Sequence, residues 1–143
     1  MFLFLTSLVY AETAYYDFRT GLCAGASAQC PIFGIKADLA LPHVGASFTL
    51  NPEPQFFTIG VTAKIYPSFS ENKEMLISRS YFYTGVVLTD YREGGSIEIG
   101  FGTDFHLFRH FIIQTSIGGG YLYGIYWPAL PVPTVSLSLM YSF

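Results

Sequence analysis

Apolar and polar residues alternate along most of this chain. The clearest example is the segment 134–143, where small polar residues fill most of the positions between the apolar ones. Its apolar positions are Val135, Leu137, Leu139, Tyr141 and Phe143. A period of two is typical of a β-strand, because successive side chains of a strand point to opposite faces. We therefore predict a strand here with one apolar face.

The same alternation returns in seven further segments, which are 16–24, 35–41, 44–50, 57–66, 79–88, 96–108 and 111–123. Most of the connections between them are short and rich in turn-forming residues. Two are longer, at 68–75 and at 124–133, and the second contains three prolines. The pattern predicts an all-β chain of eight antiparallel strands, each joined to the next along the sequence.

The last part of the chain has the charge content of a membrane segment. Residues 111–143 contain no Lys, Arg, Asp or Glu. They do contain several glycines and prolines, and a helix loses about 1 kcal/mol for each Gly and about 3 kcal/mol for each Pro relative to Ala. A helical span is therefore rejected. The other architecture that satisfies every backbone group in lipid is a closed β-barrel.

The amino-acid composition limits the classes of protein to which this chain can belong. The chain has 143 residues, of which 12% are charged and 18% aromatic, and its mean hydropathy is +0.40. The usual charged share is about 25%. Such a composition excludes disorder, which needs low hydrophobicity and high net charge. Seven scattered Lys and Arg residues also form no basic patch, so a nucleic-acid partner is not expected.

The charged residues fall on one side of the alternation. None occupies the apolar register in the middle of a predicted strand, where a charge facing lipid would cost about 2–4 kcal/mol. The positions predicted to form a polar network inside the barrel are Asp17, Arg19, Lys36, Asp38, Lys64, Arg79, Glu98, Asp104 and His106. A soluble barrel of the lipocalin kind predicts the opposite arrangement, with an apolar interior and a charged exterior.

Aromatic residues gather near the predicted strand ends. One set of ends has Phe18, Tyr66, Phe108 and Phe111. The other set has Phe56, Phe57, Tyr91, Tyr121, Tyr123 and Trp127. Two such groups are typical of the interfacial girdles of membrane barrels.

The chain begins with an apolar run that ends in Val9-Tyr10-Ala11. Residues 1–11 resemble a truncated signal peptide, because the run is followed by a small-x-Ala cleavage pattern while the basic n-region is missing. The alternative is a buried first strand. With cleavage after Ala11, residues 12–143 form a single β-barrel domain that folds in an oxidising compartment.

The chain has two cysteines, Cys23 and Cys30, separated by six residues. In an exported chain this spacing suits a disulfide that closes a hairpin loop. The alternative is two free thiols packed as small apolar residues. No histidine lies near them in sequence, so no metal site is predicted.

These features together resemble the small OmpA/OmpX-like eight-stranded outer-membrane β-barrel proteins of Gram-negative bacteria. The resemblance covers 12–143 and is most specific in the strand that ends at Phe143, which matches the terminal assembly signal of that family. It implies an antiparallel up-and-down transmembrane β-barrel in the bacterial outer membrane. The partners it implies are outer-membrane lipid and the barrel-assembly machinery. On that topology Cys23 and Cys30 flank the first surface loop, and Tyr126 and Trp127 lie on the last.

The function predicted from the sequence is structural, or an interaction through surface loops, with side chains filling the interior rather than an open pore. No cofactor is predicted, and no catalytic motif is present. Two alternatives remain. Asp104 and His106 could polarise a serine in a lipid-modifying barrel enzyme, and a soluble lipocalin-like carrier is a further possibility that the charge distribution disfavours.

Overall fold

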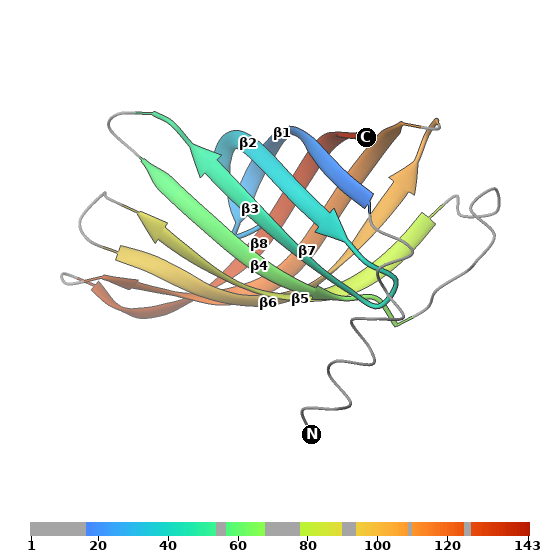
Figure 1. Ribbon diagram of the computed structural model, residues 1–143. Coiled ribbons are helices and arrows are strands. Elements are labelled where there is room, and N and C mark those ends of the chain that lie inside the picture. Colours follow the sequence, from blue (N-terminus) through green and yellow to red (C-terminus); the bar gives the residue numbers. More distant parts are fainter. Residues whose placement is uncertain (1–16, 54–56, 68–77, 90–93, 109, 125–126) are drawn as a thin grey trace, which may run out of the picture.

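The computed structural model describes residues 17–53, 57–67, 78–89, 94–108, 110–124 and 127–143, without the side chains of 30–32 and 127–128. Eight strands form one closed barrel (Figure 1). They are β1 (Asp17–Ser27), β2 (Cys30–Ala40), β3 (Val44–Asn51), β4 (Thr58–Ile65), β5 (Ser78–Thr89), β6 (Gly94–His106), β7 (Phe111–Gly124) and β8 (Trp127–Ser142). The described residues contain no helix that is long and apolar enough to cross a membrane.

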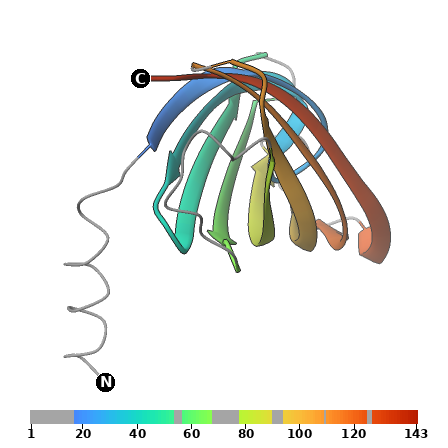
Figure 2. The same cartoon turned by 90° about the vertical axis from the view of Figure 1, so that its right-hand side faces the viewer.

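Every strand pairs antiparallel with its neighbours along the chain, and β1 pairs with β8 to close the barrel. Figure 2 shows β1 and β8 side by side where the two ends of the sheet meet. The predicted all-β fold with eight antiparallel, up-and-down strands is therefore confirmed.

The two faces of the sheet differ in polarity. Thirty large hydrophobic side chains are exposed among the described residues, and Ile99 on β6 keeps 69% of its surface accessible. Polar and charged side chains point inward instead, and Lys36 and Asp104 are 0% exposed. The barrel thus has an apolar exterior and a polar interior, the reverse of a water-soluble globular fold.

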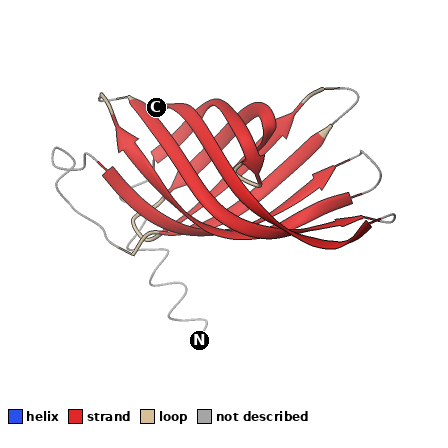
Figure 3. Cartoon of the chain, turned by 180° about the vertical axis from the view of Figure 1, so that it is seen from behind, coloured by secondary structure: helices blue, strands red, loops and turns tan. Residues whose placement is uncertain are grey.

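The connection between β1 and β2 differs from the prediction. Both strands continue to a two-residue turn, Ala28 and Gln29, which is called the β1–β2 turn below. It lies within the barrel, in the middle of Figure 3, and both of its residues are 0% exposed. The prediction that Cys23 and Cys30 flank a surface loop is therefore wrong, because the connection is buried.

The register of the neighbouring strands explains how the hairpin bends inward. β1 pairs with β8 only as far as Ala26, and β2 pairs with β3 only from Ile35 onward. The hairpin end is therefore paired with β8 almost as far as the turn, whereas residues 30–34 on the β2 side are not paired with β3. Two glycines provide the space that it occupies. A methyl group on Gly60 would lie 2.4 Å from the carbonyl oxygen of Ala28, and one on Gly85 would lie 2.6 Å from Ala28 Cβ.

The predicted loop at 124–133 is also wrong for most of its length, because β8 already begins at Trp127. The N–H of Phe143 donates to Phe18 in β1, and the N–H of Ser142 donates to His110 on the opposite side. The side toward which the backbone N–H points alternates along an antiparallel strand, so the nitrogens of Pro131 and Pro133 point toward the β1 side of β8. On that side, the pairing of β8 with β1 ends at Val135, and no described strand pairs with residues 131 and 133. The prolines therefore cost the ladder no hydrogen bond.

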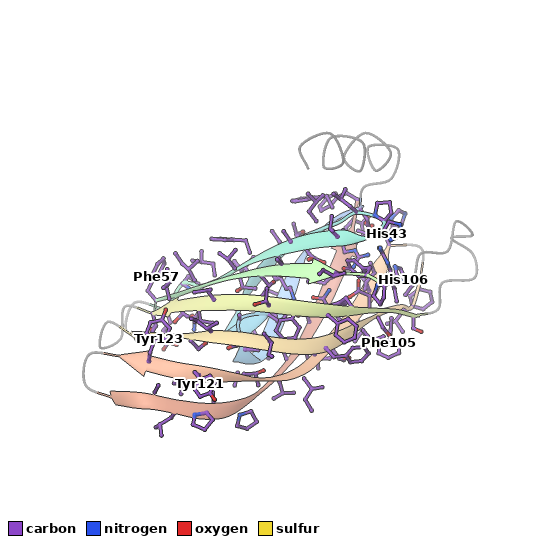
Figure 4. All side chains as sticks on the ribbon, turned by 90° about the horizontal axis from the view of Figure 1, so that it is seen from below. His43, Phe57, Phe105, His106, Tyr121 and Tyr123 are labelled. Carbon is purple, nitrogen blue, oxygen red and sulfur yellow. The ribbon has the colours of Figure 1, made fainter. Side chains whose placement is uncertain are left out.

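Aromatic residues do lie near both ends of the barrel. In Figure 4, Phe105 lies at one end together with His43 and His106, whereas Phe57, Tyr121 and Tyr123 lie at the other. Tyr66 is an exception, because it is buried in the interior at 1% exposure. Its position follows the alternation of β4, which continues one residue beyond Ile65. Two of the predicted girdle residues, Phe56 and Tyr91, lie outside the described residues.

Candidate functional site

Four charged side chains meet inside the barrel and form what is called the ion cluster below: Arg19, Asp38, Lys64 and Asp104. Arg19 Nη1 lies 2.5 Å from Asp104 Oδ2 and 3.6 Å from Asp38 Oδ2. Lys64 Nζ lies 2.6 Å from Asp38 Oδ1. All four side chains have 0% exposure. Each cation faces at least one carboxylate, and Asp17 Oδ2 adds a further one at 2.8 Å from Arg19 Nη2, which offsets the cost of removing these charges from water.

Neutral partners complete the hydrogen bonding of the ion cluster. The side-chain amide of Gln114 donates to Asp104 Oδ1 at 2.7 Å, and the Tyr66 hydroxyl donates to Asp104 Oδ2 at 3.3 Å. Tyr66 follows the last residue of β4. Burial, reinforced by the charge of Asp104, raises the pKa of its phenol well above the ordinary value. The phenol therefore remains a proton donor to the carboxylate.

Three tyrosines form a row beside the ion cluster. The ring centroids of Tyr66 and Tyr81 are 5.5 Å apart, and those of Tyr81 and Tyr83 are 6.4 Å apart. Their rings lie over glycines of the neighbouring strand, since Tyr81 pairs with Gly102 and Tyr83 pairs with Gly100. A methyl group at Gly102 would lie 2.2 Å from the Tyr81 ring. These pairs fill the interior with aromatic rings.

A second group of contacts holds the β1–β2 turn. The N–H of Ala28 donates to Glu98 Oε2 at 2.6 Å, and the Thr49 hydroxyl donates to the carbonyl oxygen of Ala28 at 3.2 Å. Lys36 Nζ donates to the side-chain oxygen of Gln29 at 2.6 Å. The partners come from β2, β3 and β6. The turn is thus bound from three strands of the wall.

Lys36 and Glu98 differ from the ion cluster in their partners. Within the described part of the chain, neither forms an ion pair. Lys36 instead donates to the side-chain oxygens of Gln29 and Gln114. Glu98 accepts from Ala28 and from the Ser96 hydroxyl, at 2.9 Å in the second case. Two buried charges therefore have neutral partners, and the β1–β2 turn supplies one to each.

The remaining predicted network residues lie toward the barrel end that holds His106. Asp17 Oδ2 accepts from Arg19 Nε at 2.8 Å. Arg79 donates to the carbonyl oxygen of Leu41 at 2.7 Å, and its guanidinium lies 3.6 Å from the centre of the Tyr66 ring. His106 is only partly buried, and its Nδ1 has no hydrogen-bond partner among the described residues.

The pair that a lipid-modifying enzyme would need is not assembled. Asp104 Oδ2 accepts from Arg19 and Oδ1 accepts from Gln114, so both oxygens of the carboxylate have other partners. No hydrogen bond joins Asp104 to His106 within the described part of the chain. The described residues also contain no group of three or more His, Cys, Asp or Glu side chains that could hold a metal ion.

The cysteines and the last strand complete the predicted positions. Cys23 is buried at 3% exposure, whereas the side chain of Cys30 lies outside the described residues. The disulfide therefore stays a prediction. All the apolar positions of the predicted assembly signal are exposed on the outer surface, namely Val135, Leu137, Leu139, Tyr141 and Phe143. Tyr126 lies outside the described residues, and Trp127 is the first residue of β8.

The outer surface carries a recess over β5 to β8 of about 1080 Å³. Its lining is mainly apolar and includes Ile99, Ile117 and Tyr121. Gly119 also lines the recess, and a methyl group at this position would meet nothing closer than the carbonyl oxygen of Val132 at 3.9 Å. The shape and the mainly apolar lining of the recess suit apolar groups.

Sequence reasoning did not single out Gln29, Gln114, Tyr81 or Tyr83, and it placed Tyr66 among the aromatic residues at the strand ends. Gln114 and Tyr81 both lie on the polar register of their segments, so the alternation could have identified them as interior residues. The contact of Tyr81 with Gly102 needed the strand register, which only the structure gives. Gln29 had no such indication, because it lies in a turn.

Comparison of the chain with known protein families, with curated proteins and with solved structures found no match.

Proposed function

We propose that this chain is an integral β-barrel protein of a bacterial outer membrane, with a structural role or a role in interaction through its surface loops. The observation that carries the proposal is the reversed polarity of the barrel. Thirty exposed large hydrophobic side chains surround an interior that buries Arg19, Lys36 and Asp104 at 0% exposure. Exposed apolar patches on soluble proteins rarely exceed a few hundred Å². A bilayer is the solvent that suits such an exterior.

The dimensions of the strands support the same proposal. A membrane-crossing β-strand needs about 9–11 residues when it is tilted, and the strands here have between 8 and 16. Aromatic residues at both ends of the barrel, such as Phe105 and Tyr121 (Figure 4), suit the two interfaces between lipid and water. On this proposal, the outward side chains of β8 contact outer-membrane lipid and form the sequence that the barrel-assembly machinery recognises.

Side chains and the β1–β2 turn fill the interior, which supports a closed barrel rather than an open pore. Eight strands enclose a space that side chains just fill. The ion cluster, the tyrosine row and the turn occupy that space here. A role in the membrane or at the cell surface therefore fits the geometry better than free passage of solutes.

The two alternatives are less well supported. A soluble carrier needs an apolar interior to hold its ligand, and the interior here contains Arg19, Lys36 and Asp104 at 0% exposure. A lipid-modifying enzyme needs a polarised nucleophile beside His106. Nδ1 of that histidine has no hydrogen-bond partner among the residues that the structure covers.

The test is to refold residues 12–143 into detergent micelles and compare boiled with unboiled samples on SDS gels. We expect β-type circular dichroism and a faster or slower band that disappears on boiling, because a closed barrel resists the detergent until it is heated. Flotation with lipid vesicles after refolding in their presence provides the second readout. A monomer that stays soluble without detergent and does not float would overturn the proposal.

A further inference from the structure

The recess over β5 to β8 is centred on Gly119 of β7. On the same face of β7, Ile117 and Tyr121 lie two residues before and after this glycine and are 65% and 61% exposed. Across the sheet, Gly119 pairs with Ile99 of β6 and with Pro133 of β8. All of these residues line the recess. Its floor is therefore the space that the missing side chain of Gly119 leaves between larger neighbours.

The exposure of Ile99 reflects the same gap. Ile99 keeps 69% of its surface accessible, whereas Phe101, two residues further along β6, keeps 42%. Phe101 packs against Phe82 of β5, with 5.8 Å between the ring centroids. Ile99 has the smaller residues Thr84 and Gly119 as its partners across the sheet. The side of Ile99 that faces β7 is therefore a wall of the recess and is open to a ligand.

The chemistry of the recess matches an uncharged, apolar ligand. Glu98 borders it, but the side chain of Glu98 turns inward and is only 3% exposed. The backbone groups beside Gly119 are paired in the ladders with β6 and β8. Among the described residues that line the recess, a lipid headgroup would find no charged partner, and a peptide strand would find no free backbone groups beside Gly119. A hydrocarbon chain needs neither.

The shape of the recess favours a flexible chain over a second copy of the barrel. The outer wall of a barrel is convex, so a second copy would contact the side chains around Gly119 and leave the floor empty. An empty space forfeits the dispersion contacts of the atoms that line it. An acyl chain can bend onto the floor. The recess is also continuous with the apolar outer surface, which the proposed function places in a bilayer.

We propose that the recess centred on Gly119 binds one acyl chain of a membrane lipid. The chain covers Gly119 and packs against Ile99 and Ile117, so this lipid stays with the barrel when detergent removes the rest of the bilayer. The inference rests on the proposed function, because it needs a bilayer around the barrel. It adds to that function a defined lipid position on the outer surface.

Retention of lipid after extraction tests the site. Residues 12–143 are refolded into vesicles of dioleoyl phosphatidylcholine, extracted with a mild detergent and examined by native mass spectrometry. We expect a species that carries one lipid. In Gly119→Leu the leucine occupies the floor, and the fraction of this species should fall about tenfold. The loss of contact with about two methylene groups is enough for such a change.

Ala24→Leu is the matched control, because it adds a leucine at another small, exposed position. Ala24 lies on β1 and does not line the recess, so this variant should retain lipid as the unchanged chain does. Ile117→Ala removes a wall of the recess without adding volume and should also lower retention. If Gly119→Leu fails to fold, Ile117→Ala carries the test.

The band shift on boiling and flotation with the vesicles are recorded for every variant. If the variants float and Gly119→Leu retains as much lipid as Ala24→Leu, the inference is overturned and the proposed function stands. A dimer that Gly119→Leu converts to a monomer would also overturn it, because the recess would then hold a second copy. If even the unchanged chain fails to float, the proposed function is wrong and the inference is lost with it.

Discussion

Arg19 on β1 and Asp104 on β6 form an ion pair across the barrel interior, with 2.5 Å between Nη1 and Oδ2, although 85 residues separate them in sequence. Both side chains are 0% exposed. The contact links strands that do not neighbour each other in the sheet. It therefore connects two strands on different sides of the barrel that no backbone hydrogen bonds join.

Asp104→Ala should lower the free energy of unfolding by about 3–5 kcal/mol, because it leaves Arg19 in the interior with less negative charge to compensate it. Replacing both residues, by Arg19→Met with Asp104→Leu, should recover most of the loss, since an apolar pair of similar volume removes both desolvation costs. Urea unfolding of the refolded barrel measures both effects. A double variant no more stable than Asp104→Ala would contradict this account.

The loss of stability caused by a charge on the outer surface should depend on how deep the substituted position lies in the bilayer. Ile99 lies near the middle of β6 and is 69% exposed, and Phe108 lies beyond its end with 74% exposure. In lipid vesicles, Ile99→Arg should cost about 2–4 kcal/mol and Phe108→Arg about 0–1 kcal/mol. Unfolding titrations of the two variants make the comparison. Equal small effects would argue that water surrounds both positions.

Three consecutive glycines of β7 should respond differently to alanine. A methyl group on Gly118 would lie 2.3 Å from the carbonyl oxygen of Ile99, and one on Gly120 would lie 2.7 Å from that of Ile97. Each of these substitutions should lower the free energy of unfolding by about 1–3 kcal/mol through overpacking. Gly119→Ala, which faces the open recess, should be neutral or stabilising by up to about 1 kcal/mol.

These three variants share one chemical change, so they control for one another. Denaturant unfolding under identical conditions gives the ranking. If Gly119→Ala lowers the free energy of unfolding as much as Gly118→Ala does, the three glycines are needed for their backbone conformation and not because the inner face lacks space for a methyl group.

The predicted disulfide between Cys23 and Cys30 is tested by alkylation. The chain is isolated from an oxidising compartment, unfolded without reductant and treated with iodoacetamide. We expect no added mass before reduction and two adducts after it, because a disulfide leaves no thiol to react. Two adducts before reduction would support the alternative of two packed thiols.

The sequence predicted the fold because the period of two extends over nearly the whole chain. A strand of a barrel has one face inside and one outside, so the alternation in 134–143 or 96–108 specifies both the strand and its two faces. The same reasoning misplaced Tyr66 as an interfacial residue. Its place on the polar register indicates the interior, and its aromatic character was given more weight than its register.

Contacts across the interior could not be predicted in the same way. The alternation indicates that Arg19, Lys64 and Asp38 face inward, but which cation meets which carboxylate depends on the tilt and closure of the sheet. The turn at Ala28 and Gln29 was missed for a similar reason. Its inward position depends on where β1 leaves β8 and on the space beside Gly60 and Gly85, which are tertiary features.

Pro131 and Pro133 have a consequence for how this barrel meets other molecules. A strand edge that offers alternating N–H and C=O groups is a template on which a neighbouring chain can add a strand, and repeated addition leads to aggregates. On the β1 side of β8, the prolines remove the donors at 131 and 133 and leave only acceptors there. The carbonyl groups of an added strand would find no N–H donors at these two positions. The edge that the bent hairpin leaves uncovered is thereby protected against self-association.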